Sequence, residues 1–236
     1  MEKEERKLDS WNEDHLKRLK VIGQDDTGYI GSNSLKWAKF VLPKKEFDLK
    51  LDNRFTRDKL FDYCKDFNND NLNVLVAILS WGGMHRSNGK ILFENHKTVL
   101  DLVEKLRTKK YNTREEAFLD FYNKRVQNDL PGLGIGYYTK LICFLSPHLN
   151  GYIMDQWAGK SINLLLNRKI VGLTAEWVSE DRNDVNTYKE FCTKIDELSK
   201  ILECDGFEAE KRIFSVGNGK GLWRNYLKEN YKKNIF

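Results

Sequence analysis

The residues with the clearest chemical potential are a glycine-rich segment, Leu130-Pro131-Gly132-Leu133-Gly134-Ile135-Gly136-Tyr137-Tyr138-Thr139-Lys140, and one aspartate, Asp155, downstream of it. Asp155 is the only acid between Leu130 and Ala175, a stretch that holds four bases: Lys140, Lys160, Arg168 and Lys169. A stretch so poor in carboxylates suits a polyanionic ligand. The one carboxylate that it keeps could act on whatever the glycine-rich segment binds.

The glycine-rich segment predicts two helices joined by a tight turn. Pro131 ends the first helix, the glycines allow a sharp turn close to a ligand, and the second helix begins at once. Its unpaired backbone N–H groups would then point out of the turn and could bind a phosphate without any side chain. Such binding does not depend on base sequence and is sensitive to salt. The alternative interpretation is a plain helix connection ended by proline and glycine.

Apolar periodicity predicts helices along most of the chain, in which only three prolines occur. The expected helices are a short one from Ser10 to Lys20, then 56–67, 71–81, one from Ser87, 97–107, one capped by Thr113 and Glu116, 137–145, 156–166, 185–203 and 207–216. Residues 21–55 look irregular, with room for short strands. The expected fold class is therefore all-α.

The composition indicates a globular chain without membrane segments. Apolar residues make up 40% and charged residues 32%, and the formal net charge is +5. No apolar run approaches about 18 residues, and the charged N-terminus does not resemble a signal peptide. The cysteines and histidines lack metal-site spacing, so we interpret the cysteines as reduced core residues. We expect a cytoplasmic or nucleoid location and no membrane partner.

The C-terminal residues 217–236 form a second basic segment. They carry five bases against Glu229, with Trp223, Tyr226 and Tyr231 interleaved. A surface that mixes basic and aromatic side chains suits nucleic acid. The alternative is an ordinary amphipathic helix with a solvated charged face.

Two segments carry a resemblance to a known family. Residues 130–140 match a Leu-Pro-Gly-Val-Gly-x-x-Thr-Ala hairpin, and Tyr152-Ile153-Met154-Asp155-Gln156-Trp157 matches a Val-Asp-x-His loop. These are motifs of the helix-hairpin-helix DNA glycosylase superfamily, which the chain resembles from about residue 71 onward. Weaker matches are Ala77–Arg86, similar to the turn that enters the hole left by a flipped base, and FEAEKRIFSVG (207–217), similar to the C-terminal helix of bacterial 8-oxoguanine-glycosylase-fold proteins.

The resemblance implies a two-lobed all-α fold with a cleft between the lobes, in a monomer that acts on DNA. Residues 1–72 would pack with 156–236 as one lobe, and 73–155 would form the central lobe with the wedge turn and the hairpin. Contacts to DNA would come from Gly132, Gly134, Gly136, Thr139 and Lys160. The family also suggests a monovalent cation held by hairpin carbonyls, here those of Gly134 and Gly136; otherwise we expect no cofactor and no metal.

The chain departs from the family at the position of the nucleophile. Bifunctional members place a lysine two residues after the second hairpin glycine, where Tyr138 or Gly136 stands here, depending on which glycine is counted. Lys140 lies about 200° around the helix from Tyr138. Because some monofunctional members have tyrosine at this position, the resemblance implies base excision without a lysine Schiff base. Tyr138 and Lys140 are kept as catalytic candidates, and a lyase activity stays open.

Asp155 is the main catalytic candidate. Hydrolysis of an N-glycosidic bond builds positive charge on the sugar as the base leaves, and a nearby carboxylate stabilises that charge and can activate water. Asp155 also directly precedes an expected helix, where aspartate is a favoured N-cap. The two roles are compatible with each other.

A base inside a duplex must leave the stack before an enzyme can reach it. The candidates for the wedge are Met84, His85 and Arg86, which follow Gly82-Gly83 where the family has glutamine or asparagine. Arg86 could bond the orphaned partner base. Trp81 and Trp157, which replaces the family's histidine, are candidates for the base pocket, although both also fit a helix core.

Three functional interpretations follow. The first is a DNA glycosylase of base excision repair, with oxidised guanine as the leading substrate. The second is a catalytically inactive DNA-binding module on the same scaffold. The third is an enzyme of antiviral defence that acts on modified nucleotides or phage DNA.

Overall fold

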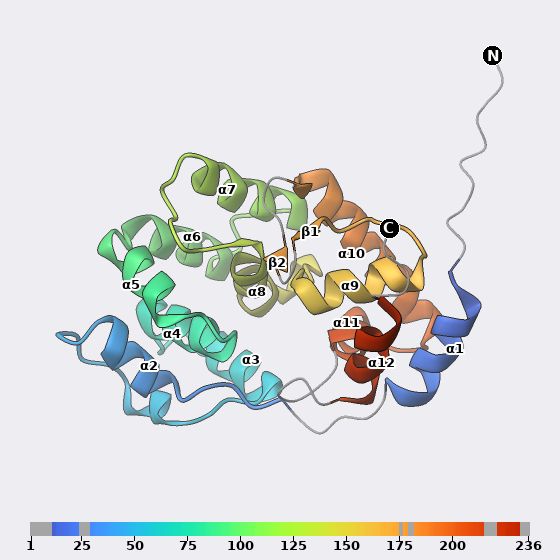
Figure 1. Ribbon diagram of the computed structural model, residues 1–236. Coiled ribbons are helices and arrows are strands. Elements are labelled where there is room, and N and C mark those ends of the chain that lie inside the picture. Colours follow the sequence, from blue (N-terminus) through green and yellow to red (C-terminus); the bar gives the residue numbers. More distant parts are fainter. Residues whose placement is uncertain (1–10, 24–28, 175–176, 179–181, 215–220, 232–236) are drawn as a thin grey trace, which may run out of the picture.

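Helices make up most of the chain, and the fold class is all-α as the sequence predicts (Figure 1). The computed structural model describes residues 11–23, 29–174, 177–178, 182–214 and 221–231. The α-helices in these ranges are α1 (Glu13–Ile22), α2 (Ser34–Val41), α3 (Arg57–Lys65), α4 (Asn71–Trp81), α5 (Arg86–Glu94), α6 (Lys97–Arg107), α7 (Arg114–Val126), α8 (Ile135–Leu145), α9 (Gln156–Leu165), α10 (Val185–Ile201), α11 (Gly206–Phe214) and α12 (Leu222–Tyr231). Two short 3₁₀ helices, η1 (Leu49–Asp52) and η2 (Pro147–Leu149), and a hairpin of two-residue strands, β1 (Leu173–Thr174) and β2 (Trp177–Val178), accompany them.

The expected helix bounds agree best where the apolar pattern is long. Helices α4 and α6 coincide with the expected 71–81 and 97–107. Ser10, expected to cap the first helix, lies outside the described residues, and Asn12 caps α1 instead. Residues 215–216 of the helix expected over 207–216 also lie outside the described residues, as do the basic residues Lys220, Lys232 and Lys233.

Helix α2 lies in the region that was expected to be irregular. The side chain of Asn33 accepts a hydrogen bond from the backbone N–H of Lys36 at 2.8 Å and so caps the helix. The buried residues of α2 include Trp37, whose indole Nε1 donates to the carbonyl of Met84 at 2.8 Å. With eight residues, α2 is too short for the apolar period to stand out from its surroundings.

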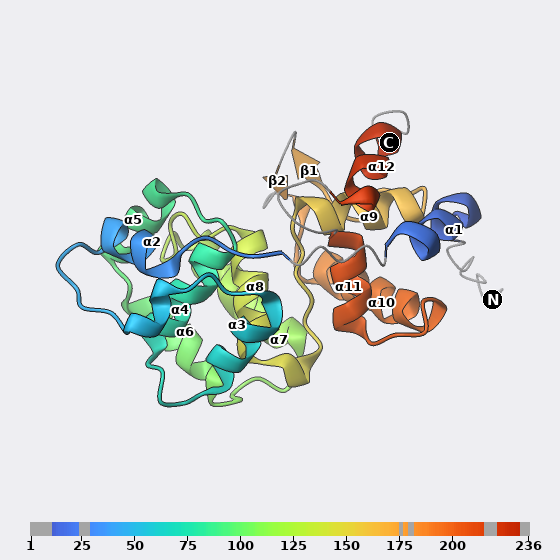
Figure 2. The ribbon, with the colours of Figure 1, turned by 90° about the horizontal axis from the view of Figure 1, so that it is seen from below.

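The helices gather in two groups, which Figure 2 separates clearly. The central group is α2 to α8, and the terminal group is α1 and α9 to α12. Helix α1 packs on α9 and α12, but α2 packs on α4 and α5, and α3 packs on α4 and α8. Residues 1–72 were expected to pack with 156–236 as one lobe; of their helices, α1 contacts the terminal group, and α2 and α3 contact helices of the central group.

Helices α4 and α8 form the centre of the core. Every residue of α4 from Asn73 to Trp81 is buried, and so is every residue of α8 from Tyr138 to Leu145. The two helices pack on each other and on α3 and α6. Because α8 follows directly from the glycine hairpin, the hairpin is anchored on the most deeply buried part of the fold.

A buried ion pair joins the two groups of helices. The guanidinium of Arg57 on α3 is bonded to the carboxylate of Glu210 on α11, whose side chain is fully buried. Burial raises the pKa of Glu210, and the neighbouring Arg57 charge opposes that rise. A second polar link runs from Arg114 on α7 to Asp196 on α10, with a nitrogen–oxygen distance of 2.8 Å.

We predict that Glu210→Ala lowers the free energy of unfolding by about 3–5 kcal/mol, because the Arg57 charge would stay buried without its partner. Urea unfolding followed by circular dichroism measures the change. The control is Asp101→Ala, which breaks an exposed pair with Lys97 one helical turn away and should cost less than about 1 kcal/mol. Equal losses in the two variants would contradict the importance of the buried pair.

Candidate active site

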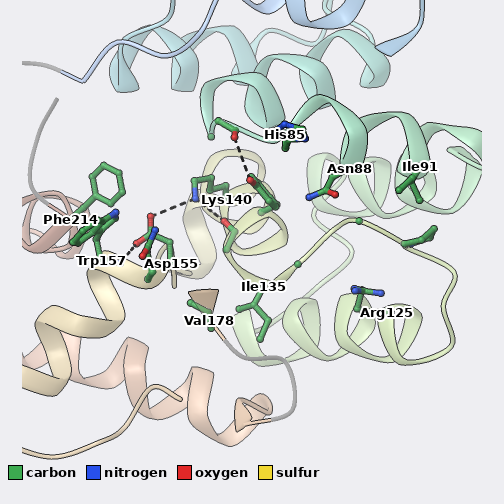
Figure 3. A pocket seen from close by; sticks show the side chains of 18 of the residues that line it. His85, Asn88, Ile91, Arg125, Ile135, Lys140, Asp155, Trp157, Val178 and Phe214 are labelled. Carbon is green, nitrogen blue, oxygen red and sulfur yellow. Dashed lines mark hydrogen bonds and ion pairs between the residues drawn. The ribbon is translucent and has the colours of Figure 1, made fainter. Parts of the chain in front are cut away.

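A pocket of about 980 Å³ opens where the hairpin, the start of α8 and the start of α9 meet (Figure 3). We call it the Asp155 pocket. The hairpin lines it with Pro131, Gly132 and Gly134, and the turn after α4 lines it with Gly82, Gly83 and His85. Sequence segments that were singled out separately therefore share one pocket.

The hairpin has the geometry of an anion site. Gly132 has a φ of +81°, and a Cβ there would lie 2.7 Å from the carbonyl oxygen of Asn88, so only glycine fits this turn against α5. Gly134 precedes α8, and no side chain caps the first turn of that helix. The wall of the pocket at Gly134, Ile135 and Gly136 thus contains a helix N-terminus, the feature expected for binding a phosphate.

Asp155 caps α9 with one carboxylate oxygen and faces Lys140 with the other. Its Oδ1 accepts hydrogen bonds from the backbone N–H groups of Trp157 (2.8 Å) and Ala158 (3.1 Å), so it caps α9. Its Oδ2 lies 3.8 Å from the Nζ of Lys140. One carboxylate oxygen therefore holds the helix, and the other turns towards the amine in the pocket.

Thr139 positions the loop that carries Asp155. It is fully buried; its hydroxyl donates to the carbonyl of Ile135 at 2.8 Å and accepts from the backbone N–H of Met154 at 3.1 Å. The sequence assigned Thr139 to DNA contact, but burial removes it from any surface that DNA could reach. Its hydroxyl instead ties α8 to the residue before Asp155.

Lys140 reaches Asp155 from the buried side of α8. Its side chain is 7% exposed, and its Nζ donates to the carbonyl of Gly136 at 2.8 Å (Figure 3). Burial lowers the pKa of Lys140, and the Asp155 carboxylate opposes that change. A Cβ on Gly82 would lie 2.8 Å from Cδ of Lys140, so glycine at this turn makes room for the side chain.

Tyr138 lies on the other side of α8 and does not line the Asp155 pocket. It is fully buried, stacks on Phe121 and meets Phe118 edge-on, with centroid distances of 5.5 and 5.2 Å. The angular separation of Tyr138 and Lys140 expected from the helix period is therefore real. Lys140 is the member of this pair that faces Asp155, and Tyr138 is a core residue.

The turn after α4 offers two of its three wedge candidates to a ligand. Met84 is only 2% exposed, so it belongs to the core. His85 is exposed, lines the pocket and bonds Ser87 at the start of α5. Arg86 is exposed, and its guanidinium lies 4.7 Å from the ring centroid of Phe40.

Of the two tryptophans expected in a base pocket, only Trp157 lines the pocket. Trp81 is buried in the core, where it meets Tyr29 and Phe144 edge-on. Lys160, expected on DNA, does not line the pocket; its Nζ lies 4.8 Å from the ring centroid of Trp157.

Several residues that line the pocket were missed by the sequence analysis, among them Tyr29, Phe214 and Arg224. The guanidinium carbon of Arg224 lies 4.3 Å from the ring centroid of Trp157 and 4.9 Å from that of Phe214. The ring of Tyr29 meets that of Phe214 edge-on. The only available signal was the basic and aromatic composition of the C-terminal segment, which did not single out Arg224.

The hairpin carbonyls expected to hold a monovalent cation already accept hydrogen bonds within the protein. The oxygen of Gly134 accepts from the backbone N–H groups of Tyr137 and Tyr138, and that of Gly136 accepts from Lys140 Nζ. Within the described ranges, no cluster of three or more His, Cys, Asp or Glu side chains has the geometry to hold a metal ion. None of the helices in these ranges has the length and apolar character that crossing a membrane requires.

Comparison with known proteins yields one match. A family model described as "Putative 8-oxoguanine DNA glycosylase OGG-like protein" matches residues 30–214, which include the hairpin, Lys140 and Asp155. No curated protein and no solved structure matches significantly. Because the match covers most of the chain and contains the centre of the Asp155 pocket, the protein belongs to this OGG-like DNA glycosylase family.

Proposed function

We propose that the protein is a DNA glycosylase that flips out and removes a damaged or modified base, with oxidised guanine as the leading candidate, and that Asp155 is its catalytic carboxylate. The observation that carries the proposal is Asp155 itself. Among the described residues it is the single acid that lines the pocket, whose wall also contains an uncapped helix N-terminus, two glycine turns, and basic and aromatic side chains.

The arrangement suits cleavage of an N-glycosidic bond. The N–H groups at the start of α8 would bind a phosphate beside the target nucleotide and so bring the sugar to Asp155. As the bond from C1′ to the base nitrogen lengthens, positive charge grows on the sugar, and Oδ2 of Asp155 would stabilise it. The same carboxylate can accept a proton from the water that attacks C1′.

We predict that Asp155→Asn lowers the rate of base release by about 10²–10⁴-fold. Asparagine keeps an oxygen that can cap α9, so the fold and the DNA affinity should be retained. The measurement is base release from duplexes that each contain 8-oxoguanine, uracil, a thymine mismatch or a modified cytosine. Each reaction is analysed with and without alkali, which cleaves abasic sites.

The matched control is Asp184→Asn. Asp184 caps α10 as Asp155 caps α9, but it does not line the pocket, so its variant should keep full activity. Unchanged base release in Asp155→Asn would contradict the proposal. Salt-sensitive DNA binding by the wild type without release of any base would favour a binding module on the same scaffold.

A second activity, cleavage of the DNA strand at the abasic site, is favoured by one contact: the amine of Lys140 lies beside Asp155. The family position for a nucleophilic lysine holds no lysine here, which is why excision without a Schiff base was expected. Lys140, however, folds back by one helical turn onto the carbonyl of Gly136. A neutral amine there could attack C1′ and displace the base as the bond from C1′ to the base nitrogen breaks, with the amine proton passing to Asp155. Breaking of the C1′–O4′ bond would then give the Schiff base, and loss of a C2′ proton with departure of the 3′ oxygen would cleave the strand.

We predict that borohydride traps a covalent complex of the wild type with substrate DNA and that Lys140→Gln abolishes it. Trapping should increase with pH, because the neutral amine is the nucleophile. It should level off at a lower pH than for an exposed lysine, because burial lowers the pKa of Lys140. Gel electrophoresis of the trapped complex measures the yield.

A relocation variant and a control sharpen this test. In Gly136→Lys combined with Lys140→Gln, the new Cβ would lie no closer than 3.5 Å to its neighbours, so the backbone accepts a side chain here and the new amine beside Asp155 should restore trapping. Lys160→Gln should keep trapping. Product that appears only after alkali, with no trapped complex, would mean that Lys140 serves only as the ionic partner of Asp155 and that the enzyme is monofunctional.

A further inference from the structure

One part of the Asp155 pocket has no role in the steps above. We call it the arginine corner: Arg224 from α12, the rings of Trp157 and Phe214 on which its guanidinium lies, and Tyr29. The phenol of Tyr29 donates to the carbonyl of Trp81 at 2.8 Å, which holds the ring in place at the pocket wall. The corner joins three segments that are far apart in sequence.

Arg224 is held firmly in this corner. It is 7% exposed, and its Nη2 donates to the carbonyl of Phe214 at 2.6 Å. Burial lowers the pKa of Arg224, and the Asp155 carboxylate opposes that change. Because a guanidinium stays protonated in proteins, the pocket contains a fixed positive charge with several N–H donors.

Trp157 connects this charge with the catalytic carboxylate. Its backbone N–H donates to Asp155 Oδ1, and its ring carries the guanidinium of Arg224. A nucleotide whose sugar lies against Asp155 would therefore have its base on the side of the arginine corner. The ring of Trp157 in that corner already lies beside two cations, Lys160 and Arg224.

Glycosidic cleavage needs two kinds of charge stabilisation. When the bond from C1′ to the base nitrogen breaks, its electron pair leaves with the base, so the sugar becomes positive and the base negative. Water then bonds to C1′, and its proton passes by way of Asp155 to the solvent or to the departed base. Asp155 stabilises the sugar but repels the departing base, which requires a cation or a hydrogen-bond donor of its own.

We propose that Arg224 supplies this second stabilisation by donating hydrogen bonds to oxygen or nitrogen acceptors of the departing base. The inference rests on the proposed glycosylase function and narrows its substrate class. The corner suits neutral bases that leave as anions and present acceptor atoms, such as oxidised or deaminated bases. It disfavours N-alkylated purines, which already carry positive charge and would be repelled by Arg224.

The test compares Arg224→Gln with the wild type in single-turnover base release and in duplex affinity. We expect the rate on the best neutral base of the panel (8-oxoguanine, uracil, a thymine mismatch or a modified cytosine) to fall about 10²–10³-fold. The dissociation constant of the same duplex should change less than threefold, because the contact strengthens only as the base leaves. A duplex with 7-methylguanine, a cationic base, should react no faster with the wild type than with Arg224→Gln.

Two further variants separate chemistry from folding. Arg212→Gln removes a partly buried arginine that pairs with Glu208 outside the pocket, and it should keep the wild-type rate. In Arg224→Ala, added guanidinium chloride should restore activity at least tenfold above sodium chloride at the same ionic strength. A purely structural loss would not respond to this ion.

Each outcome of these experiments either supports or contradicts the proposed role of Arg224. Wild-type release of a neutral base with an unchanged rate in Arg224→Gln would overturn the inference and leave the glycosylase proposal intact. A parallel loss of rate and duplex affinity would assign Arg224 to a backbone phosphate and would also overturn it, as would preferred release of 7-methylguanine. No base release by the wild type from any duplex would contradict the glycosylase proposal and the inference together.

Discussion

The site depends on one buried contact, the approach of the Lys140 amine to Asp155. The carboxylate of Asp155 contacts this amine and the N-terminus of α9 at the same time: Oδ2 faces the amine, and Oδ1 accepts hydrogen bonds from the helix. The N-terminus of α8 lies in the same wall without a capping side chain. The Asp155 carboxylate thus lies among a cation and two helix N-termini. The surrounding positive charge favours binding of an anionic ligand, although the carboxylate itself would repel one.

Glycine at position 82 leaves space for this contact, and glycine at position 132 leaves space for the hairpin beside it. At Gly82 a Cβ would press on the Lys140 side chain, and at Gly132 it would meet the backbone of α5. The wedge turn therefore contributes to the site even before any DNA is bound, because its first glycine lets Lys140 reach the pocket. The family's glutamine or asparagine in this turn would compete with that path unless the lysine side chain moved.

The features that could be predicted from the sequence are those that depend only on neighbouring residues. The hairpin follows from proline and glycine chemistry, and the cap at Asp155 from its place before an amphipathic helix. The helix period separates Tyr138 from Lys140, but only the packing of α8 on α4 and α7 decides that Tyr138 enters the core. Thr139 was misassigned for the same reason: no spacing rule tells a buried hydroxyl that ties two segments from one that meets a ligand. Tyr29 and Arg224 come from opposite ends of the chain, so no local pattern could bring them together.

The residues that line the pocket fall partly inside and partly outside the region that matches the family model. The family match covers residues 30–214, and so it contains the hairpin, Lys140 and Asp155 but neither Tyr29 nor Arg224. Tyr29 and Arg224 line the arginine corner, and α12 reaches it by packing on α9 and α11. Because the proposed catalytic groups, Asp155 and Lys140, lie inside the match and two side chains of this corner lie outside it, members of one family could share a reaction and still differ in the base that they release. Family membership therefore supports cleavage of an N-glycosidic bond more strongly than it supports 8-oxoguanine as the base that is released.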